Sequence, residues 1–264
     1  MKSSTIYLLA FCMLVIYGCK KIINVNLNDA SPQIVIEGNI YNTAGPYQVK
    51  ISKTVNFSAS NIYPGVSGAF VKVADITSGV TNILSETSAG LYITSSLQGV
   101  PGHTYQLTVI TGGQTYTASS TMPQAITLDS IGFQHNAGNV GSNINPVVNF
   151  QDPAGINNYY NFTQFVNGIQ LKSQNPFSDR LSDGRYISQQ LFNDSSYIRI
   201  GDTILVQMNC VDKNVWNFFN TLVEATNGNS FQSAAPANPI SNLSNNALGY
   251  FSASTINTKK RVAF

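Results

Sequence analysis

The chain has 264 residues, of which 43% are hydrophobic, and its formal net charge is +2. This length suffices for one large domain or two ordinary ones, and the apolar content argues against a long disordered chain. Only 10% of the residues are charged, against about 25% in typical soluble domains. Since these charges form no basic cluster, the composition argues against nucleic acid as a partner.

The N-terminal segment has the form of a secretion signal. Lys2 precedes an uninterrupted apolar run over residues 6–16, which is too short to span a bilayer. The run leads into Ile16-Tyr17-Gly18-Cys19, which resembles a bacterial lipobox. We expect a signal peptide over residues 1–18, cleavage before Cys19 and lipidation of its thiol, so that a lipid anchor holds the protein on a membrane. A plain secreted protein and an uncleaved signal anchor are the alternatives.

Residues 19–31 are predicted to be the lipidated cysteine and a short tether, and residues 32–123 carry the pattern of an all-β sandwich. Turn signals separate short apolar or alternating runs at 33–40, 47–51, 69–76, 90–93 and 105–109. Gly112-Gly113 then turns the chain into residues 114–121, which predicts a hairpin. We therefore predict an N-terminal immunoglobulin-like or fibronectin-like β-sandwich over residues 32–123.

Residues 124–264 are predicted to form a second β-rich domain. A strand at 146–150 and the turn Asp152-Pro153-Ala154-Gly155 precede a long aromatic strand over 158–169, which Asn167-Gly168 should end or bend. Residues 195–200 and 203–211 are expected to pair as a hairpin through Gly201-Asp202. A loop over 229–247 and a late strand at 249–253 complete the domain.

One segment of the second domain has helical periodicity. Asp212 suits an N-cap, and Asn227-Gly228 suits a stop. Between them, apolar residues recur at helical spacing: Val215, Phe219, Leu222 and Val223, with Trp216 adjoining. We expect a helix at about 212–226 and interpret its apolar stripe as a core face rather than a ligand platform.

The body of the chain offers few residues for catalysis or metal binding. His103 and His135 are its two histidines, and both are interpreted as surface or turn residues. The Gly-x-Ser-x-Gly and His-Glu-x-x-His patterns and phosphate-binding glycine loops are absent. Cys210 is alone and is expected to be a small buried residue on a strand. We therefore predict no catalytic residue, no cofactor, no metal site and no enzymatic activity.

An acidic loop is the one candidate for a cation. Asp179 and Asp183, with Asp194 beyond, offer oxygens of the kind that Ca²⁺ prefers. The loop lacks the Asp-x-Asp-x-Asp-Gly spacing, and Arg180 and Arg185 are expected to compensate its charge. A solvated loop is the preferred interpretation, ahead of a calcium site or a pair of glycosidase carboxylates.

A family resemblance rests on several segments taken in order. They are residues 19–28 leading into Pro32-Gln33-Ile34-Val35-Ile36-Glu37-Gly38, Gly68-Ala69 before Val71-Lys72-Val73, residues 99–105, Asp152-Pro153 before Asn158-Tyr159-Tyr160, and residues 246–253. Together they resemble the Bacteroidota lipoprotein family called domain of unknown function 4249, over essentially the whole mature chain. The resemblance implies an outer-membrane lipoprotein that is an accessory or substrate-capturing partner of a TonB-dependent transporter. It implies no catalytic residues.

Two further expectations depend on this bacterial setting. Surface lipoproteins of the phylum often carry acidic residues after the cysteine, whereas here Lys20-Lys21 follows. The cell surface and the periplasmic face of the outer membrane therefore both stay open. Asp129-Ser130-Ile131 and Asp202-Thr203-Ile204 match a short periplasmic O-glycosylation pattern, so Ser130 and Thr203 are candidate modification sites. Such short patterns also arise by chance.

The leading functional hypothesis is a non-enzymatic binding or accessory partner of a transporter. A structural or assembly component of the outer membrane is the first alternative, and a hydrolase with an unrecognised site is the second. If a ligand is bound, the sandwich loops and the strand at 159–165 are the first places to look.

Overall fold

The computed structural model describes residues 31–56, 59–60, 62–136, 143–193, 198–226 and 238–264. Within these ranges the chain is mainly β with one helix, which confirms the predicted fold class. The predicted signal peptide, Cys19 and residues 20–30 of the tether lie outside the described residues. Residues 32–264 form one compact unit.

Short strands make up the first half of this unit. They are β1 (Ile34–Tyr41), β2 (Gln48–Lys53), β3 (Phe70–Asp75), β4 (Thr81–Ile83), β5 (Ser85–Ser88), β6 (Leu91–Ile93), β7 (Thr104–Thr111) and β8 (Gln114–Thr121). The predicted hairpin at Gly112-Gly113 is confirmed, because β7 and β8 pair antiparallel around these two glycines, which both have positive φ.

The second half contains the remaining strands and the helix. They are β9 (Ser130–Asn136), β10 (Asn143–Gln151), β11 (Tyr159–Val166), β12 (Ile169–Gln170), β13 (Asn175–Ser178), β14 (Tyr186–Gln190), β15 (Thr203–Val211), α2 (Lys213–Thr226) and β16 (Leu248–Val262). The predicted bend of the aromatic strand is confirmed, since Asn167 and Gly168 take positive φ between β11 and β12.

One predicted hairpin is wrong. The sequence pattern paired residues 195–200 with 203–211, but β15 pairs antiparallel with β11 on one side and with β16 on the other. Residues 198–200 form no strand, and residues 195–197 lie outside the described residues. Gly201-Asp202 is a turn, as expected, and it leads the chain into the middle of a sheet rather than back along a neighbour.

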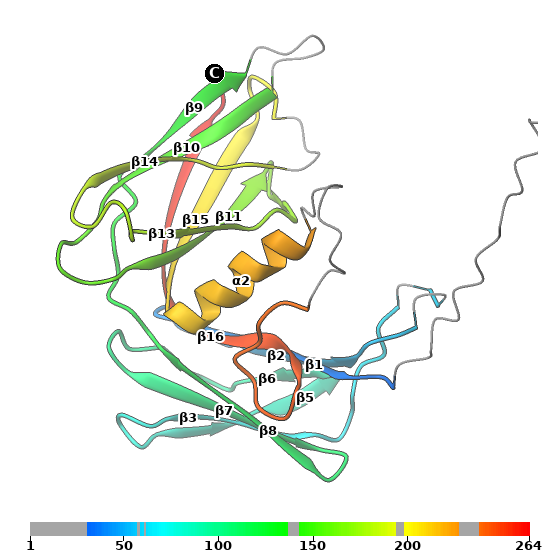
Figure 1. Cartoon of the computed structure of the whole chain (residues 1–264). Coiled ribbons are helices and arrows are strands. Elements are labelled where there is room, and N and C mark those ends of the chain that lie inside the picture. The colour runs from blue at the N-terminus through cyan, green and yellow to red at the C-terminus, as the bar shows by residue number, and fades with distance from the viewer. Residues whose placement is uncertain (1–30, 57–58, 61, 137–142, 194–197, 227–237) are drawn as a thin grey trace, which may run out of the picture. The chain divides into compact units, whose positions relative to one another are not determined.

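A large sheet runs through both halves, in the order β12-β11-β15-β16-β1-β2-β6-β5, with β13 also paired to β11. Its central strand β16 is 15 residues long. The first part of β16 pairs in parallel with β1, and the rest pairs antiparallel with β15. In Figure 1, β16 accordingly passes from the group of strands that contains β1 to the group that contains β15.

Two smaller sheets cover one face of the large sheet. The sheet β4-β3-β7-β8 encloses a first hydrophobic core, and the sheet β14-β10-β9 encloses a second. On β16, Phe251 and Ala253 belong to the first core, and Ala263, one residue beyond the strand, belongs to the second. Since alternate residues of a strand share a face, both cores lie on the same side of β16. We call this side the covered face.

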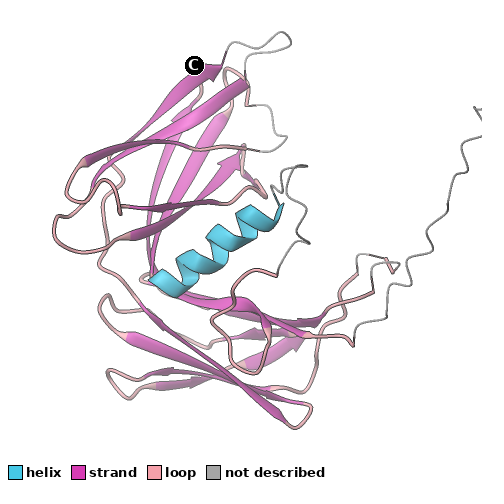
Figure 2. Ribbon diagram, in the orientation of Figure 1, coloured by secondary structure: helices cyan, strands magenta, loops and turns pink. Residues whose placement is uncertain are grey.

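The helix α2 lies on the opposite side, which we call the open face (Figure 2). Val215, Phe218 and Phe219 are buried there and pack with the strand residues Tyr159 and Tyr250. Asp212 caps the helix, because its Oδ1 accepts hydrogen bonds from the amides of Asn214 and Val215. The predicted helix and its core-facing stripe are therefore confirmed.

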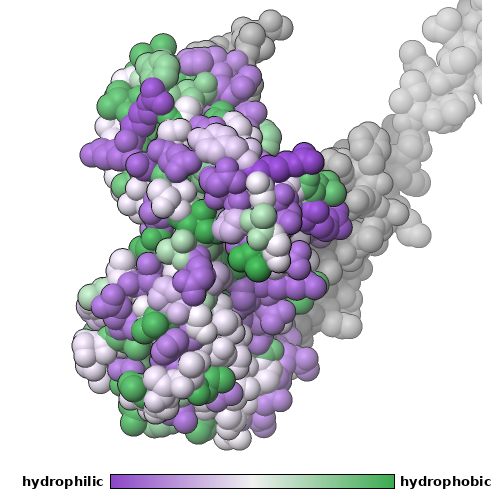
Figure 3. Space-filling view, turned by 90° about the vertical axis from the view of Figure 1, so that its left-hand side faces the viewer, coloured by the Kyte–Doolittle hydropathy of each residue, from purple (hydrophilic) through white to green (hydrophobic). Residues whose placement is uncertain are grey.

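The predicted boundary at residues 123 and 124 separates Met122, in the first core, from Ile126, in the second. Phe251 and Ala253 lie in the predicted second domain and nevertheless belong to the first core, so the division into two domains stays a prediction about independent folding. The described residues include no helix with the length and apolarity needed to cross a bilayer. Figure 3 shows hydrophobic residues in small groups among hydrophilic and neutral ones on one side of the molecule.

Candidate functional site

The open face carries a polar cavity of about 300 Å³, which we call the amide pocket. Strands β1, β11, β15 and β16 supply most of its walls, and Phe219 of α2 closes one side. Its lining contains amides, hydroxyls, aromatic rings and one valine, but no charged side chain: Asn39, Tyr41, Asn161, Thr163, Phe165, Gln170, Gln174, Gln207, Asn209, Val211, Phe219, Tyr250, Ser252 and Ser254.

Strand alternation explains why these groups gather here. On β15 the apolar residues Ile204, Val206 and Met208 point into the second core. The intervening Gln207 and Asn209 therefore point to the open face. The register of β11 places Asn161 opposite Asn209 and Thr163 opposite Gln207. The pocket floor is thus a set of facing polar pairs.

Hydrogen bonds hold the floor but leave one acceptor free. Gln207 Nε2 donates to Asn209 Oδ1 at 2.8 Å, and Asn209 Nδ2 donates to the Asn161 carbonyl at 3.0 Å. Asn161 Nδ2 donates to Gln174 Oε1 at 3.0 Å. Asn161 is 3% exposed, yet its Oδ1 has no partner among the described residues. A buried acceptor left in this state costs about 1–3 kcal/mol, which a donor on a ligand would recover.

Two tyrosines give the pocket an aromatic wall without adding charge. Asn39 Nδ2 donates to the Tyr250 hydroxyl at 3.1 Å. Burial raises the pKa of Tyr250. Burial also raises the pKa of Tyr41, and the neighbouring phenols Tyr250 and Tyr47 raise it further, although a hydrogen bond with Gln207 lowers it. Both phenols therefore stay neutral at physiological pH, and the pocket presents only uncharged donors and acceptors.

The amide pocket has a larger, more open neighbour along the same face. That hollow measures about 650 Å³ and shares Phe165 and Gln207 with the amide pocket, while Thr258 and Lys260 of β16 extend it toward the strand's end. The two cavities are therefore neighbours on the open face.

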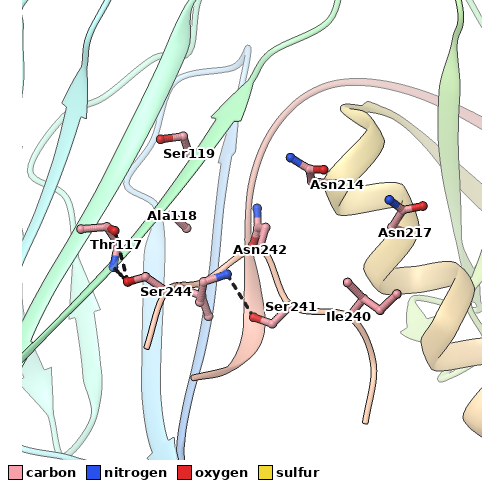
Figure 4. Close-up of a pocket in the computed structure, with 10 residues that line it drawn as sticks. Thr117, Ala118, Ser119, Asn214, Asn217, Ile240, Ser241, Asn242 and Ser244 are labelled. Carbon is pink, nitrogen blue, oxygen red and sulfur yellow. Dashed lines mark hydrogen bonds between the residues drawn. The ribbon is translucent and has the colours of Figure 1, made fainter. Parts of the chain in front are cut away.

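A third cavity lies elsewhere, between β8, the start of α2 and residues 240–244 (Figure 4). Several of its polar groups are already paired. Ser244 Oγ accepts from the Thr117 amide at 2.8 Å, and Ser241 Oγ accepts from the Leu243 amide at 3.1 Å. Asn242 bonds both backbone groups of Phe251. The polar groups of this cavity are thus used to hold residues 240–244 against β8 and β16. The amide pocket, which has an unpartnered buried acceptor, is therefore the better ligand site.

The acidic loop folds into a cluster that includes an aspartate outside the prediction. Asp152, Asp179 and Asp183 each place a carboxylate oxygen within 4.8 Å of the others, and we call them the aspartate cluster. Asp152 and Asp179 are each only 1% exposed. Burial raises the pKa of Asp179, and the charges of Asp152 and Asp183 raise it further. A hydrogen bond from the backbone amide of Asn158 lowers it.

Among the described residues, no ion pair provides the charge compensation that was expected for this cluster. Arg180 and Arg185 are both exposed. Among the residues that the structure describes, the single ion pair joins His103 to Asp75. The two arginines are close to the cluster in sequence but form no ion pair with it.

The chain matches the family model described as Domain of unknown function (DUF4249) over residues 20–260. The protein belongs to this family. The match confirms the resemblance that the ordered segments indicated. The comparison with curated proteins gives no match. The family description names no catalytic or binding residues, so the candidate site rests on the geometry of the chain itself.

The remaining predicted residues of this DUF4249 chain neither line the amide pocket nor belong to the aspartate cluster. Ser130 begins β9 and is half-buried, and Thr203 begins β15 and is half-buried. His103 bonds Asp75 at 2.8 Å, and His135 is exposed on β9. Cys210 is buried on β15, as predicted, and burial raises the pKa of its thiol. O-glycosylation at Ser130 and Thr203 stays a prediction, and Asp194 lies outside the described residues.

Sequence reasoning pointed to the strand at 159–165 but missed the residues that make the pocket. Asn161, Gln207 and Asn209 are uncharged polar residues of a kind common on any solvent-facing strand. The available signal was the alternation of β15, where two amides interrupt a run of buried apolar residues. Asp152 was interpreted only as part of a turn, because 27 positions separate it from Asp179 in the sequence.

Proposed function

We propose that this DUF4249 chain is a non-enzymatic binding protein of the cell envelope that holds a small, neutral, hydroxyl- or amide-rich ligand in the amide pocket. The observation that carries the proposal is the uncharged polar lining around the buried, unpartnered Asn161 Oδ1. Ligand sites of this volume combine apolar walls with a few placed polar groups, which matches the aromatic and amide composition of the pocket.

The lining also argues for binding rather than catalysis. General acid–base or nucleophilic catalysis needs a group that can take up or release a proton near neutral pH. The 14 lining residues include no Asp, Glu, His, Lys, Arg or Cys. Serine and threonine hydroxyls without a neighbouring base are poor nucleophiles, and the two tyrosines stay protonated. A hydrolase at this pocket has no group to activate water.

We further propose that the protein is lipid-anchored at the outer membrane through Cys19 and that it delivers its ligand to a TonB-dependent transporter. The lipobox at residues 16–19 and the family resemblance support this part of the proposal. A structural or assembly role in the outer membrane is the outcome that negative binding and co-purification results would favour.

The binding proposal is tested by isothermal titration calorimetry and saturation-transfer NMR. The probes are neutral mono- and disaccharides, uncharged blocked dipeptides, dicarboxylates and polyamines, titrated into the full-length protein in detergent. We expect binding from a neutral class and none from either charged class, since a charged group would be desolvated in the pocket without a counter-charge. Binding confined to charged probes would refute the proposal.

A matched pair of variants locates the ligand. Gln207→Ala removes a half-buried strand glutamine from the pocket floor, and Gln106→Ala removes a half-buried strand glutamine from β7 in a different sheet. We expect Gln207→Ala to weaken binding about tenfold, as the loss of one or two hydrogen bonds does, and Gln106→Ala to leave affinity unchanged. Equal effects of both variants would place the ligand elsewhere.

The proposed lipid anchor and the proposed complex with a transporter are tested by affinity co-purification of the protein from native membranes in mild detergent. Mass spectrometry identifies the proteins recovered. The control is Cys19→Ala. Enrichment of a TonB-dependent transporter with the wild type and its loss with the variant supports the proposal. Recovery of the wild type alone would contradict a stable complex with a transporter. Unchanged membrane partitioning of Cys19→Ala would contradict the lipid anchor.

A further inference from the structure

Two turns bring the aspartate cluster together at one end of the second core. Asp152 comes from the turn after β10, and Asp179 and Asp183 come from the connection between β13 and β14. The Cβ that would be built on Gly184 lies 2.7 Å from Ala154 Cβ, so the two turns are in close contact. Groups far apart in the sequence thus share one small volume.

Hydrogen bonds orient the three carboxylates. Asp152 accepts from the Tyr160 hydroxyl and, at 3.0 Å, from the Gly184 amide. Asp179 Oδ2 accepts a hydrogen bond from the backbone amide of Asn158 at 2.7 Å. Asp183 accepts from the Gly155 amide at 2.9 Å. Because each carboxylate oxygen has two lone-pair sites, acceptor capacity remains on all three groups.

An independent observation comes from Asn158, which is not acidic. Its side chain is 7% exposed, and its Oδ1 has no hydrogen-bond partner among the described residues. Tyr159 is opposite Ser178 in the antiparallel pair β11–β13, and the same register extended by one residue beyond both strands sets Asn158 opposite Asp179. The Asp179 amide donates to the Asn158 carbonyl at 3.2 Å, in keeping with that register.

In an antiparallel pair of strands, the side chains of two directly opposed residues point to the same face. We therefore expect the side-chain amide of Asn158 to lie beside the Asp179 carboxylate and to point toward the aspartate cluster. From this register we infer that the buried, unpartnered Asn158 oxygen is directed toward the three carboxylates, which form no ion pair with any described residue. Buried acceptors and like charges in this arrangement are costly unless a cation lies between them.

We propose that Asp152, Asp179, Asp183 and the Asn158 side-chain oxygen bind a hard divalent cation, and that calcium fits best. Calcium takes six to eight oxygen ligands at about 2.4 Å, so two ligands of one ion lie at most about 4.8 Å apart. One carboxylate oxygen from each of the three aspartates lies within that distance of the other two. Asp183 is exposed, which leaves room for water as a further ligand on its side.

The ion joins the turn at 152–155 to the connection at 179–185. It thereby fastens the edge of the sheet β14-β10-β9 to β11 and β13 of the large sheet. This role is structural and independent of the amide pocket, which lies on the other face of β11 because Asn161 and Asn158 differ by an odd number of positions.

The test uses full-length protein in detergent, stripped with EDTA and titrated with CaCl₂ or MgCl₂ by calorimetry and by thermal unfolding. We expect one calcium ion per chain, a rise in the unfolding temperature with calcium, and a weaker response to magnesium. Ligation of this kind stabilises the folded state in proportion to the logarithm of the free calcium concentration above its dissociation constant.

Asp183→Asn removes an exposed ligand and should weaken calcium binding at least about tenfold without unfolding the protein, since affinity follows the charge count of the ligands. Asp129→Asn, an exposed aspartate that precedes β9, is the matched control and should bind like the wild type. No heat and no shift at millimolar calcium would overturn the proposal. Equal losses in the two variants, or equal responses to calcium and magnesium, would also overturn a specific calcium site.

Discussion

The two faces of the large sheet are built from the same strands and differ in almost every other respect. On the covered face, β11 and β15 place Tyr160, Phe162, Val206 and Met208 in a core from which solvent is excluded. On the open face, the residues between them are amides and hydroxyls around a cavity. Strand alternation thus places residues that stabilise the fold on one face and residues that are free to bind a ligand on the other, although the two kinds are neighbours in the sequence.

The largest effect is expected when the covered face is damaged. Phe162 is fully buried, with its ring centroid 5.9 Å from that of Phe150. Phe162→Ala should lower the free energy of unfolding by about 3–5 kcal/mol, because it leaves a cavity in the core. The adjacent open-face change Thr163→Ala should cost less than about 1 kcal/mol. Urea unfolding of both variants measures the contrast, and similar losses would contradict the division of roles between the faces.

An intermediate effect is expected at Asp212, which connects the faces. Its Oδ1 caps α2, while its Oδ2 accepts from Ser120 and from the Thr121 amide of β8. Ser120 Oγ in turn accepts from the Ala253 amide of β16.

Asp212→Ala should therefore lower the free energy of unfolding by about 1–2 kcal/mol, the usual range for a lost N-cap. It should also weaken ligand binding, because α2 supplies Phe219 to the pocket. Asp212→Asn keeps a capping oxygen and should lose less. A variant that unfolds more easily yet binds normally would show that the helix position does not matter to the pocket.

The smallest effect is expected in the sheet that covers the first core, and it depends on pH. Asp75 Oδ2 lies 2.8 Å from His103 Nδ1. Burial raises the pKa of Asp75, but hydrogen bonds from His103, Ser78 and Thr77 outweigh burial and hold that pKa below its ordinary value of 3.8. The folded state therefore binds the proton of Asp75 less readily than the unfolded state does.

The stability contributed by Asp75 is thus fully present above pH 3.8 and is lost as the pH falls through the lowered pKa. Asp75→Asn should reduce the free energy of unfolding by up to about 1 kcal/mol at pH 7, and the difference from the wild type should shrink below pH 3.8. Urea midpoints measured across this range provide the check. A difference that stays constant with pH would mean that the carboxylate charge contributes nothing.

Alternation and turn chemistry were sufficient to predict much of this fold. Strands β1, β2, β3, β7, β8 and β11 and the helix all lie where the sequence indicated. Strands β4 and β5 were missed because they are short and β5 is wholly exposed, so neither has an apolar alternation. Strand β16 was predicted only at its apolar start, because Asn257, Lys259 and Lys260 gave its second part a polar character.

Pairing was harder to predict than strands, for a physical reason. A local pattern reports which face of a strand is buried but not which strand lies beside it. The parallel pairing of β1 with β16 and the placement of β15 between β11 and β16 depend on contacts between distant segments. The amide pocket and the aspartate cluster both assemble from such segments, so neither could be completed from the sequence.

The pairing of β16 with β1 has a consequence for how this protein folds. Val35 pairs with Leu248, so the first and the last of the described strands lie side by side. Pairings of such long range slow folding, because the loop must close before its contacts form. The first core is incomplete without Phe251 of β16, and the second is incomplete without Ala263, the residue that follows β16. Folding of the two cores is therefore coupled through this one segment.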